Sequence, residues 1–181
     1  GMISGLLVEG NFIYGHAQNG LILDGVEAST FRNNVVYANA RHCLRGYQID
    51  GAAGPRALYI VNNTFAAVGA GFAVRLTEDR GQHVIFNNVL YAESGGGSVS
   101  LEAPGLAMVG ANATTDGTGV IAATTSLFVD FAAGDFRLAP GSEAIDRGLA
   151  TFGGVGAPAT DVAGATRPLG AAIDLGAYES P

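Results

Sequence analysis

Three side chains that can bind anions or move protons stand at related places in this chain. Asp50 closes a short alternating segment, Arg75 stands inside the next such segment, and His42 lies in the loop before the first of them. A carboxylate, a guanidinium and an imidazole together can bind sugar hydroxyls and carboxylates, or transfer protons. We therefore predict Asp50, Arg75 and His42 as the catalytic candidates.

Further polar residues accompany these three and are predicted to bind a ligand. They are Asp24, Gln48, Ser100 and Glu102 on alternating segments, with Arg41 and Arg45 in the loop 39–46. An earlier loop adds His16. The alternative interpretation is an exposed sheet face whose charges only keep the protein in solution.

A recurring asparagine indicates which elements position these side chains. It occurs at Asn11, Asn34, Asn63, Asn88 and Asn112, with gaps of 23, 29, 25 and 24 residues. The first four stand in nearly the same local sequence, and the fifth is the most degenerate. A period in the twenties with one fixed polar residue is typical of a repeat architecture.

Each repeat has the pattern of three short strands. A β-prone run precedes the asparagine, two or three mostly apolar residues follow it, and an alternating segment closes the repeat (21–24, 47–50, 72–76 and 99–102). The 28 glycines would be costly inside helices. We predict an all-β fold, a right-handed single-stranded parallel β-helix of about five coils. The asparagine should occupy a left-handed turn between the second and third strands, with side-chain amides stacked between coils.

The alternation also predicts which side chains face outward on the sheet formed by the closing segments. The inward set is Leu21, Leu23, Tyr47, Ile49, Val74, Leu76, Val99 and Leu101. The outward rows are Ile22, Gln48, Arg75 and Ser100, beside Asp24, Asp50, Thr77 and Glu102. This register places Asp50 and Arg75 diagonally across adjacent coils.

Composition limits the possible partners and sites. Hydrophobic residues make up 48% and charged residues 14% of the 181 residues, which suits one domain with an apolar coil interior. We find no uninterrupted apolar run long enough for a membrane span, and predict none. A net charge of -7 without a basic run argues against nucleic acid as a partner. The single Cys43 is expected to be a small buried or loop thiol and not a nucleophile, and no Cys-His metal cluster is predicted.

After about residue 120 the asparagine period stops and two other motifs follow. One runs from Pro140 to Gly148, and the other from Asp174 to Glu179 at the end of the chain. Both resemble the tail that closes many bacterial right-handed β-helix proteins of the pectate-lyase-like superfamily. With the coils, the resemblance covers nearly the whole chain. It implies a secreted or cell-surface protein in a setting where many relatives act on polysaccharides.

The resemblance also suggests how the chain is organised. Residues 1–120 are predicted to form the coils, and residues 121–181 an irregular C-terminal cap of the same domain. The aromatic and aliphatic residues expected to cover the last coil are Phe128, Phe131, Phe136, Leu138, Ile145 and Tyr178. Asp146 and Asp174 should pair with Arg147 or Arg167, or accept hydrogen bonds from backbone amides.

Two functional hypotheses remain open from the sequence. The first is a carbohydrate-binding β-helix without catalysis, because this chain has no lysine and lacks the paired aspartates and Gly-His-Gly signature of polygalacturonase-like hydrolases. The second is a polysaccharide lyase or hydrolase, or a fragment of one, acting along the first sheet. An arginine-based lyase would use Arg75 as the base, with calcium held by Asp24, Asp50 or Glu102.

Overall fold

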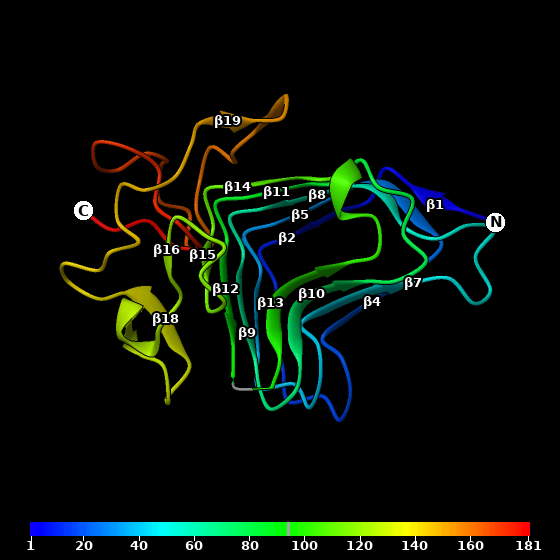
Figure 1. Ribbon diagram of the computed structural model, residues 1–181. Helices are drawn as coiled ribbons and strands as arrows, with labels where there is room; N and C mark the ends of the chain where they lie inside the picture. The colour runs from blue at the N-terminus through cyan, green and yellow to red at the C-terminus, as the bar shows by residue number, and fades with distance from the viewer. Residues whose placement is uncertain (94) are drawn as a thin grey trace.

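Each repeat forms three short strands, and each strand pairs in parallel with its counterpart in the next repeat (Figure 1). The computed structural model describes residues 1–93 and 95–181. The predicted all-β parallel β-helix is confirmed. The four-stranded sheet gives four complete coils, one fewer than the five expected, because the residues after Asn112 do not build another complete repeat.

Three parallel sheets run along the helix axis, and we number them in the order in which the chain visits them from residue 21 onward. Sheet 1 contains β4 (Leu21–Asp24), β7 (Leu44–Tyr47), β10 (Phe72–Leu76) and β13 (Gly97–Leu101). Sheet 2 contains β1 (Ile3–Ser4), β2 (Leu7–Glu9), β5 (Val26–Arg32), β8 (Arg56–Val61), β11 (Val84–Phe86) and β14 (Met108–Gly110). Sheet 3 contains β3 (Phe12–Tyr14), β6 (Val35–Tyr37), β9 (Thr64–Ala67), β12 (Val89–Ala92), β15 (Ala113–Thr114) and β16 (Ile121–Ala122).

Apolar side chains of equivalent positions stack on one another inside the coils. In sheet 2, Phe31 is in register with Ile60, and Ile60 with Ile85. In sheet 3, Phe65 is in register with Leu90. All five are completely buried, so the period-two alternation of each strand lines the coil interior and removes this apolar surface from water.

The repeated asparagines form one continuous side-chain ladder. The Nδ2 atoms of Asn11, Asn34, Asn63 and Asn88 each donate to Oδ1 of the next asparagine, at 2.9, 3.0, 2.9 and 2.9 Å. Each of these Oδ1 atoms also accepts the backbone N–H of the preceding rung, at 2.8 to 3.1 Å. Asn112, the degenerate fifth site, is the last rung. The predicted asparagine stacking at the turn between the second and third strands is confirmed.

The left-handed residue of this turn is the one before the ladder asparagine. Gly10, Asn33, Asn62, Asn87 and Ala111 have φ of 70°, 53°, 51°, 58° and 48°. The prediction that the ladder residue itself adopts left-handed angles was wrong. Because the preceding residue turns the chain, the ladder side chain is left pointing to the coil interior, where its amide bonds the neighbouring coils.

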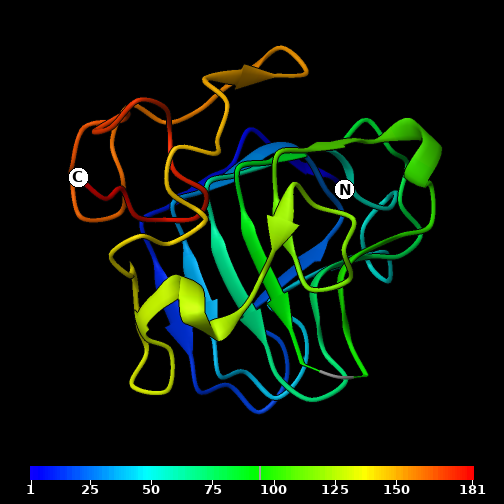
Figure 2. The same cartoon turned by 60° about the vertical axis from the view of Figure 1, so that its left-hand side comes forward.

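The C-terminal segment packs along the flank of the coils and not over their end (Figures 1 and 2). It begins after β16 with a 3-10 turn (Thr125–Leu127), followed by the antiparallel pair β17 (Phe128–Asp130) and β18 (Asp135–Leu138). A second small pair, β19 (Thr151–Phe152) and β20 (Val155–Gly156), lies further on. Phe128, Phe136 and Leu138 are buried against the outward residues of sheet 3, with Phe131, Ile145 and Tyr178 partly buried beside them. These residues therefore cover sheet 3, where we had expected a lid on the last coil.

The outward asparagines of the turns fasten this segment to the coils. Nδ2 of Asn33 donates to the carbonyl of Thr160 at 2.7 Å, and Nδ2 of Asn62 to that of Asp174 at 3.0 Å. Nδ2 of Asn87 donates to the carbonyl of Leu149 at 2.8 Å. These left-handed asparagines thus form a second row along the coils. This row holds the C-terminal segment, while the ladder row connects each coil to the next.

Charged groups of the tail are satisfied mostly by backbone amides. Asp174 accepts from the backbone N–H groups of Asp146 and Ser180, both at 2.7 Å, and Asp146 accepts from that of Ala172 at 2.7 Å. Arg167 forms a buried ion pair with Glu179, so neither Asp146 nor Asp174 takes the arginine partner considered for it. Over the described residues, no helix is long and apolar enough to cross a membrane.

Candidate binding site on sheet 1

The outward face of sheet 1 carries an arginine pair that the sequence register had misplaced. Arg45 of β7 lies directly beside Arg75 of β10, with Ile22 on one side and Ser100 on the other. Neighbouring strands are about 4.8 Å apart, so two guanidinium groups leave the sheet side by side. Ile22, Arg75 and Ser100 occupy the row predicted for them, and Arg45 takes the position assigned to Gln48.

The error in the second coil has a clear local cause. Its strand runs from Leu44 to Tyr47, three residues earlier than expected, and Gly46 occupies the inward position held by Leu23 and Leu76 in the adjacent coils. A Cβ atom on Gly46 would lie 2.7 Å from Leu76 Cδ2, so the neighbouring leucine fills the space. Because this glycine interrupts the apolar alternation of residues 44–47, residues 47–50 showed the clearer alternating pattern and were predicted as the strand instead.

Several candidate residues therefore lie away from Arg75. Tyr47 points outward, and Ile49, predicted to be inward, is 74% exposed. Asp50 lies beyond the strand, where its backbone N–H donates to Asp24 at 2.8 Å. Gln48 also follows the strand, and its side chain bonds the carbonyl of Gly51. The predicted diagonal pairing of Asp50 with Arg75 was wrong.

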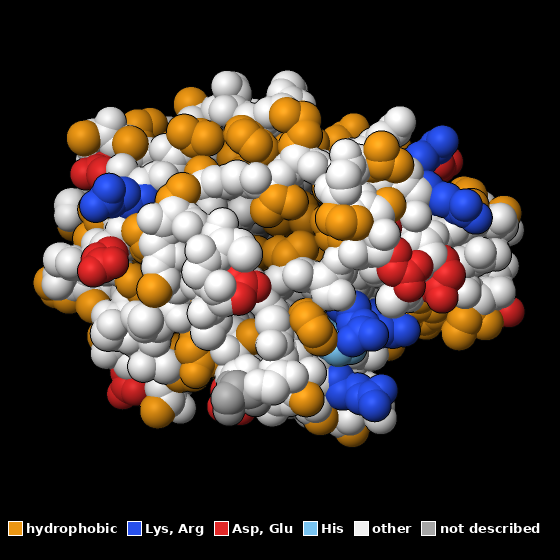
Figure 3. Space-filling model, in the orientation of Figure 1, with side chains coloured by type: hydrophobic (Ala, Val, Ile, Leu, Met, Phe, Trp, Pro, Cys, Tyr) orange, Lys and Arg blue, Asp and Glu red, His pale blue; other side chains and the backbone are white. Residues whose placement is uncertain are grey.

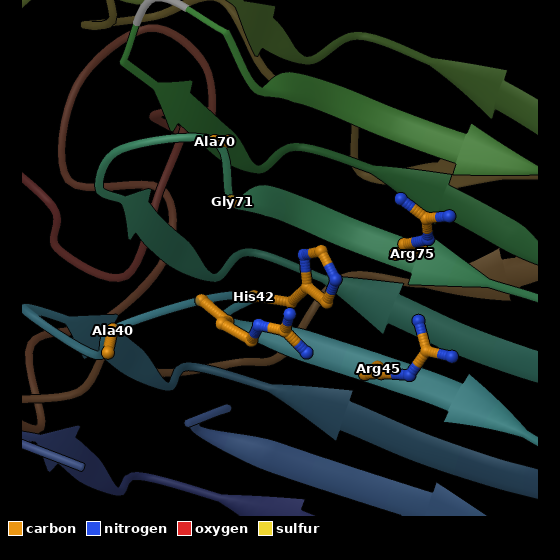
Figure 4. Close-up of a pocket in the computed structure, with 7 residues that line it drawn as sticks. Ala40, His42, Arg45, Ala70, Gly71 and Arg75 are labelled. Atoms are coloured by element: carbon orange, nitrogen blue, oxygen red, sulfur yellow. The ribbon is translucent and has the colours of Figure 1, made fainter. Parts of the chain in front are cut away.

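A pocket of about 390 Å³ opens at the start of the sheet 1 strands (Figure 4). Its lining residues are Ala40, Arg41, His42, Arg45, Ala70, Gly71 and Arg75. Figure 4 shows the side chains of His42, Arg45 and Arg75 standing on the same side of the sheet. Four of the nine predicted site residues, Arg41, His42, Arg45 and Arg75, are thus brought together. Neither the remaining five nor His16 line this pocket.

Aromatic rings hold the two central guanidinium groups. Cζ of Arg45 lies 5.3 Å from the ring centroid of Tyr47, and Cζ of Arg75 lies 5.2 Å from that of Phe72. Such cation-π contacts orient an arginine without neutralising its charge. The sequence analysis missed both rings as supports, although Tyr47 stands two residues after Arg45 and so on the same face of a strand.

The arginines of the pocket keep their charge unpaired within the described part of the chain. There, Arg32, Arg56, Arg137 and Arg167 form ion pairs with carboxylates, and Arg41, Arg45 and Arg75 do not. Nε of Arg75 is buried and has no hydrogen-bond partner among these residues. Figure 3 shows arginine and histidine atoms gathered in one patch on this face. In a protein of net charge -7, this is a local positive site.

His42 contributes a hydrogen-bond donor to the pocket. The residue is more than nine-tenths buried, and Nδ1 accepts the backbone N–H of Phe72 at 2.9 Å. The neutral ring must therefore carry its proton on Nε2. Burial, followed by the charges of Arg75, Arg45 and Arg41, lowers the pKa of His42 to about 4. At neutral pH the pocket thus offers an imidazole N–H beside three guanidinium groups.

Gly71 fixes the close stacking that shapes this pocket. A Cβ atom at this position would lie 2.1 Å from the carbonyl oxygen of Arg41, which is backbone and cannot move aside cheaply. The loop before β10 therefore rests directly on the loop that carries Arg41 and His42. Any side chain at position 71 would push these two residues away from Arg75.

Within the described residues, neither a group of three metal ligands nor an exposed thiol accompanies the arginines. Over residues 1–93 and 95–181, the His, Cys, Asp and Glu side chains form no group of three able to hold a metal ion. Cys43 is buried in the coil interior, and this burial raises the pKa of its thiol. Its Sγ lies 3.3 Å from the carbonyl oxygen of Val36, as expected for a structural thiol.

The arrangement can bind an anion through charge and through several N–H donors. Guanidinium groups bind carboxylates, sulfates and phosphates through paired hydrogen bonds. In comparisons with known proteins, no protein-family model matches this chain, and no curated protein matches its sequence.

Proposed function

We propose that this chain is a secreted or cell-surface β-helix protein that binds an acidic carbohydrate in the arginine pocket of sheet 1. The observation that carries the proposal is the set of guanidinium groups without ion pairs, Arg41, Arg45 and Arg75, beside the N–H of His42. A pocket of about 390 Å³ lies within the range of small-molecule sites, about 300–1,000 Å³. A carboxylate or sulfate on a sugar can accept hydrogen bonds from several of these donors at once.

The C-terminal motifs support a bacterial origin and membership of the pectate-lyase-like superfamily as part of the same proposal. The parallel β-helix is consistent with that superfamily. One fold carries many functions, however, so the pocket and not the fold is the basis for a carbohydrate ligand.

The geometry of His42 favours binding over catalysis at this site. A lyase needs a proton acceptor beside the bound acid, and a hydrolase needs a pair of carboxyl groups. The lone pair of His42 Nδ1 is already used by the N–H of Phe72, and no carboxylate is among the residues that line the pocket in the described chain. A lyase or hydrolase remains the second candidate, with Arg75 as the base considered from the sequence.

Matched ligands and variants test the proposal. We would titrate digalacturonate and its methyl ester into the wild-type protein, Arg75→Gln and the control Arg80→Gln, whose arginine is exposed and outside the pocket. The acid should bind better than its ester, and Arg75→Gln should weaken binding by about 1.5–3 kcal/mol, the scale of a hydrogen bond to a charged group. Equal binding of acid and ester, or an equal loss in Arg80→Gln, contradicts the proposal.

A wider screen separates the two candidate functions. Acidic glycans would be offered with and without calcium, and the products followed by ultraviolet absorbance for unsaturated sugars. Binding without new absorbance supports a carbohydrate-binding protein. Calcium-dependent absorbance that disappears in Arg75→Gln would instead establish the lyase.

A further inference from the structure

The outward face of sheet 1 carries charges of both signs in neighbouring rows. The first row contains Arg45 and Arg75. The second row, two residues further along each strand, begins with Asp24 beside Tyr47. Strands β10 and β13 stay in register up to Leu76 and Leu101, so Thr77 and Glu102 follow at the same level. Two residues of a strand span about 6.6 Å, so the two rows are close enough for one ligand to contact both.

We call Asp24 and Glu102 of the second row, with the neighbouring Glu78 that follows Thr77, the acidic row, and backbone amides hold their carboxylates in place. The carboxylate of Asp24 accepts the N–H groups of Ile49, Asp50 and Gly51 at 3.0, 2.8 and 3.1 Å. Glu102 accepts the N–H of Glu78 at 2.7 Å, and Glu78 accepts that of Gln48 at 3.4 Å. These contacts fix the positions of the carboxylates at the end of the strands. Because backbone amides carry no net charge, they leave the negative charges in place.

The two rows do not neutralise each other. Within residues 1–93 and 95–181, no arginine or histidine forms an ion pair with Asp24, Asp50, Glu78 or Glu102. In Figure 3, acidic atoms lie directly beside the patch of arginine and histidine atoms. The face therefore presents a positive pocket and a negative edge to the same ligand.

We propose that this face recognises a zwitterionic glycan, with its acidic group in the arginine pocket and a protonated amine of a neighbouring sugar at Glu78 and Glu102. The inference rests on the proposed function, since the arginine pocket anchors the ligand. A uniformly acidic chain would place its next carboxylate against the acidic row, where like charges repel. An amino sugar at that place gains an attraction instead, and so the site selects alternating over uniform charge.

The test compares two oligosaccharides that differ only in the amine, with a uniformly acidic oligosaccharide as a third ligand. We would titrate carboxymethylated chitosan oligomers with free amines, the same oligomers after N-acetylation, and tetragalacturonate. At about pH 5.5 a sugar amine is protonated, while His42, with a pKa of about 4, is neutral. The free-amine oligomer should bind about fivefold more tightly than its acetylated form, as expected for exposed ion pairs. It should also bind more tightly than tetragalacturonate, which like the acetylated oligomer carries only negative charge.

Two variants assign this preference to the acidic row. Glu78→Gln combined with Glu102→Gln keeps an amide oxygen for each backbone N–H and removes both charges, so the preference for the free amine should disappear. Glu143→Gln, an exposed residue of the C-terminal segment, should leave it unchanged. If the double variant does not fold, the comparison of the two oligomers on the wild-type protein decides.

The outcomes separate this inference from the proposed function. Equal binding of the free-amine and acetylated oligomers, with binding still lost in Arg75→Gln, overturns the inference and leaves the acidic-carbohydrate site. Binding of none of the three ligands overturns both. Tighter binding of tetragalacturonate than of the free-amine oligomer also overturns the inference, because the acidic row would then have no effect on selection.

Discussion

Nδ2 of Asn63 donates to Oδ1 of Asn88 at 2.9 Å, in the completely buried middle of the asparagine ladder. Nδ2 of Asn63 also donates to the carbonyls of Phe31 and Val61, and its Oδ1 accepts from Nδ2 and the backbone N–H of Asn34. One side chain thus connects three coils. Asn11 makes the equivalent contact with Asn34 at the exposed end of the same ladder.

This difference between the middle and the end of the ladder predicts the effect of mutation. Asn63→Val should lower the free energy of unfolding by at least about 3 kcal/mol, because several buried polar groups lose their partners together. Asn11→Val should cost about 1 kcal/mol or less, since water can replace the lost bonds. Urea denaturation of both variants checks this, and equal losses would contradict an energetic role for the buried ladder.

Asn62 should control how firmly the C-terminal segment is held. Glycine adopts the left-handed backbone of this position without strain, so Asn62→Gly removes only side-chain bonds. These are the two donated to the carbonyls of Asp174 and Gly176 and the one that Oδ1 accepts from Nδ2 of Asn87. Hydrogen exchange at the backbone amides of Leu175 and Gly176 should accelerate by the equivalent of about 1–3 kcal/mol. Amides of β10 should exchange as in the wild type.

Ala111→Gly is the matched control for that experiment. Ala111 occupies the same left-handed position of the last coil, with φ of 48°, and its methyl side chain donates no hydrogen bond to the tail. Glycine there should leave exchange in the tail unchanged. Faster tail exchange in both variants would show that backbone flexibility, and not the Asn62 side chain, governs the attachment.

Asp174 should make the stability of the tail depend on pH. Burial raises the pKa of its carboxyl to about 6 from 3.8, against the opposing effect of the amides of Asp146 and Ser180. A raised folded-state pKa means that the folded protein holds this proton more tightly than the unfolded chain does. The stabilisation is therefore complete below about pH 3.8 and is lost as pH rises through about 6.

Asp174→Asn isolates this contribution. The difference in free energy of unfolding between wild type and variant should shift in favour of the wild type by on the order of 1 kcal/mol between about pH 7 and pH 4. Thermal denaturation over this range, followed for both proteins, measures the shift. A difference that does not change with pH would mean that Asp174 titrates normally.

Much of the fold follows from the sequence because one residue type is tied to one turn. The ladder asparagine recurs with its flanking apolar residues, so strand order, sheet number and stacking can be predicted. Details set by contacts between coils are not visible in that pattern. The space beside the inward Gly46 is filled by Leu76 of the next coil. Because this contact between coils is not visible in the sequence, the second strand was predicted three residues too late.

The site was predictable in its residue types and not in its geometry. Arg41, His42, Arg45 and Arg75 come together because the loop before β7 rests on the loop before β10, through Gly71. Asp50 was assigned to them by the same register error. The place of the tail was also hidden, because the outward residues of sheet 3, such as Val35 and Val89, look like any apolar strand residues until Phe128 and Phe136 are seen against them.

His42 should report directly on an anion in the pocket. Its pKa of about 4 in the free protein, against the ordinary 6.5, arises from burial and then from Arg75, Arg45 and Arg41. A bound carboxylate or sulfate offsets the arginine charges, so the pKa of His42 should rise when an acidic sugar binds. By linkage, the same sugar should bind more tightly as pH falls from about 6 toward 4, provided that it stays ionised.

A nuclear magnetic resonance titration of the His42 ring tests this with and without digalacturonate. Arg75→Gln should raise the pKa of His42 in the free protein and reduce the further rise on adding the sugar, because one of the responsible charges is gone. The methyl ester of digalacturonate, which carries no charge, should leave the pKa where it was. A pKa near 6.5 in the free wild-type protein would mean that the ring is solvated, and the donor pocket built on it would have to be abandoned.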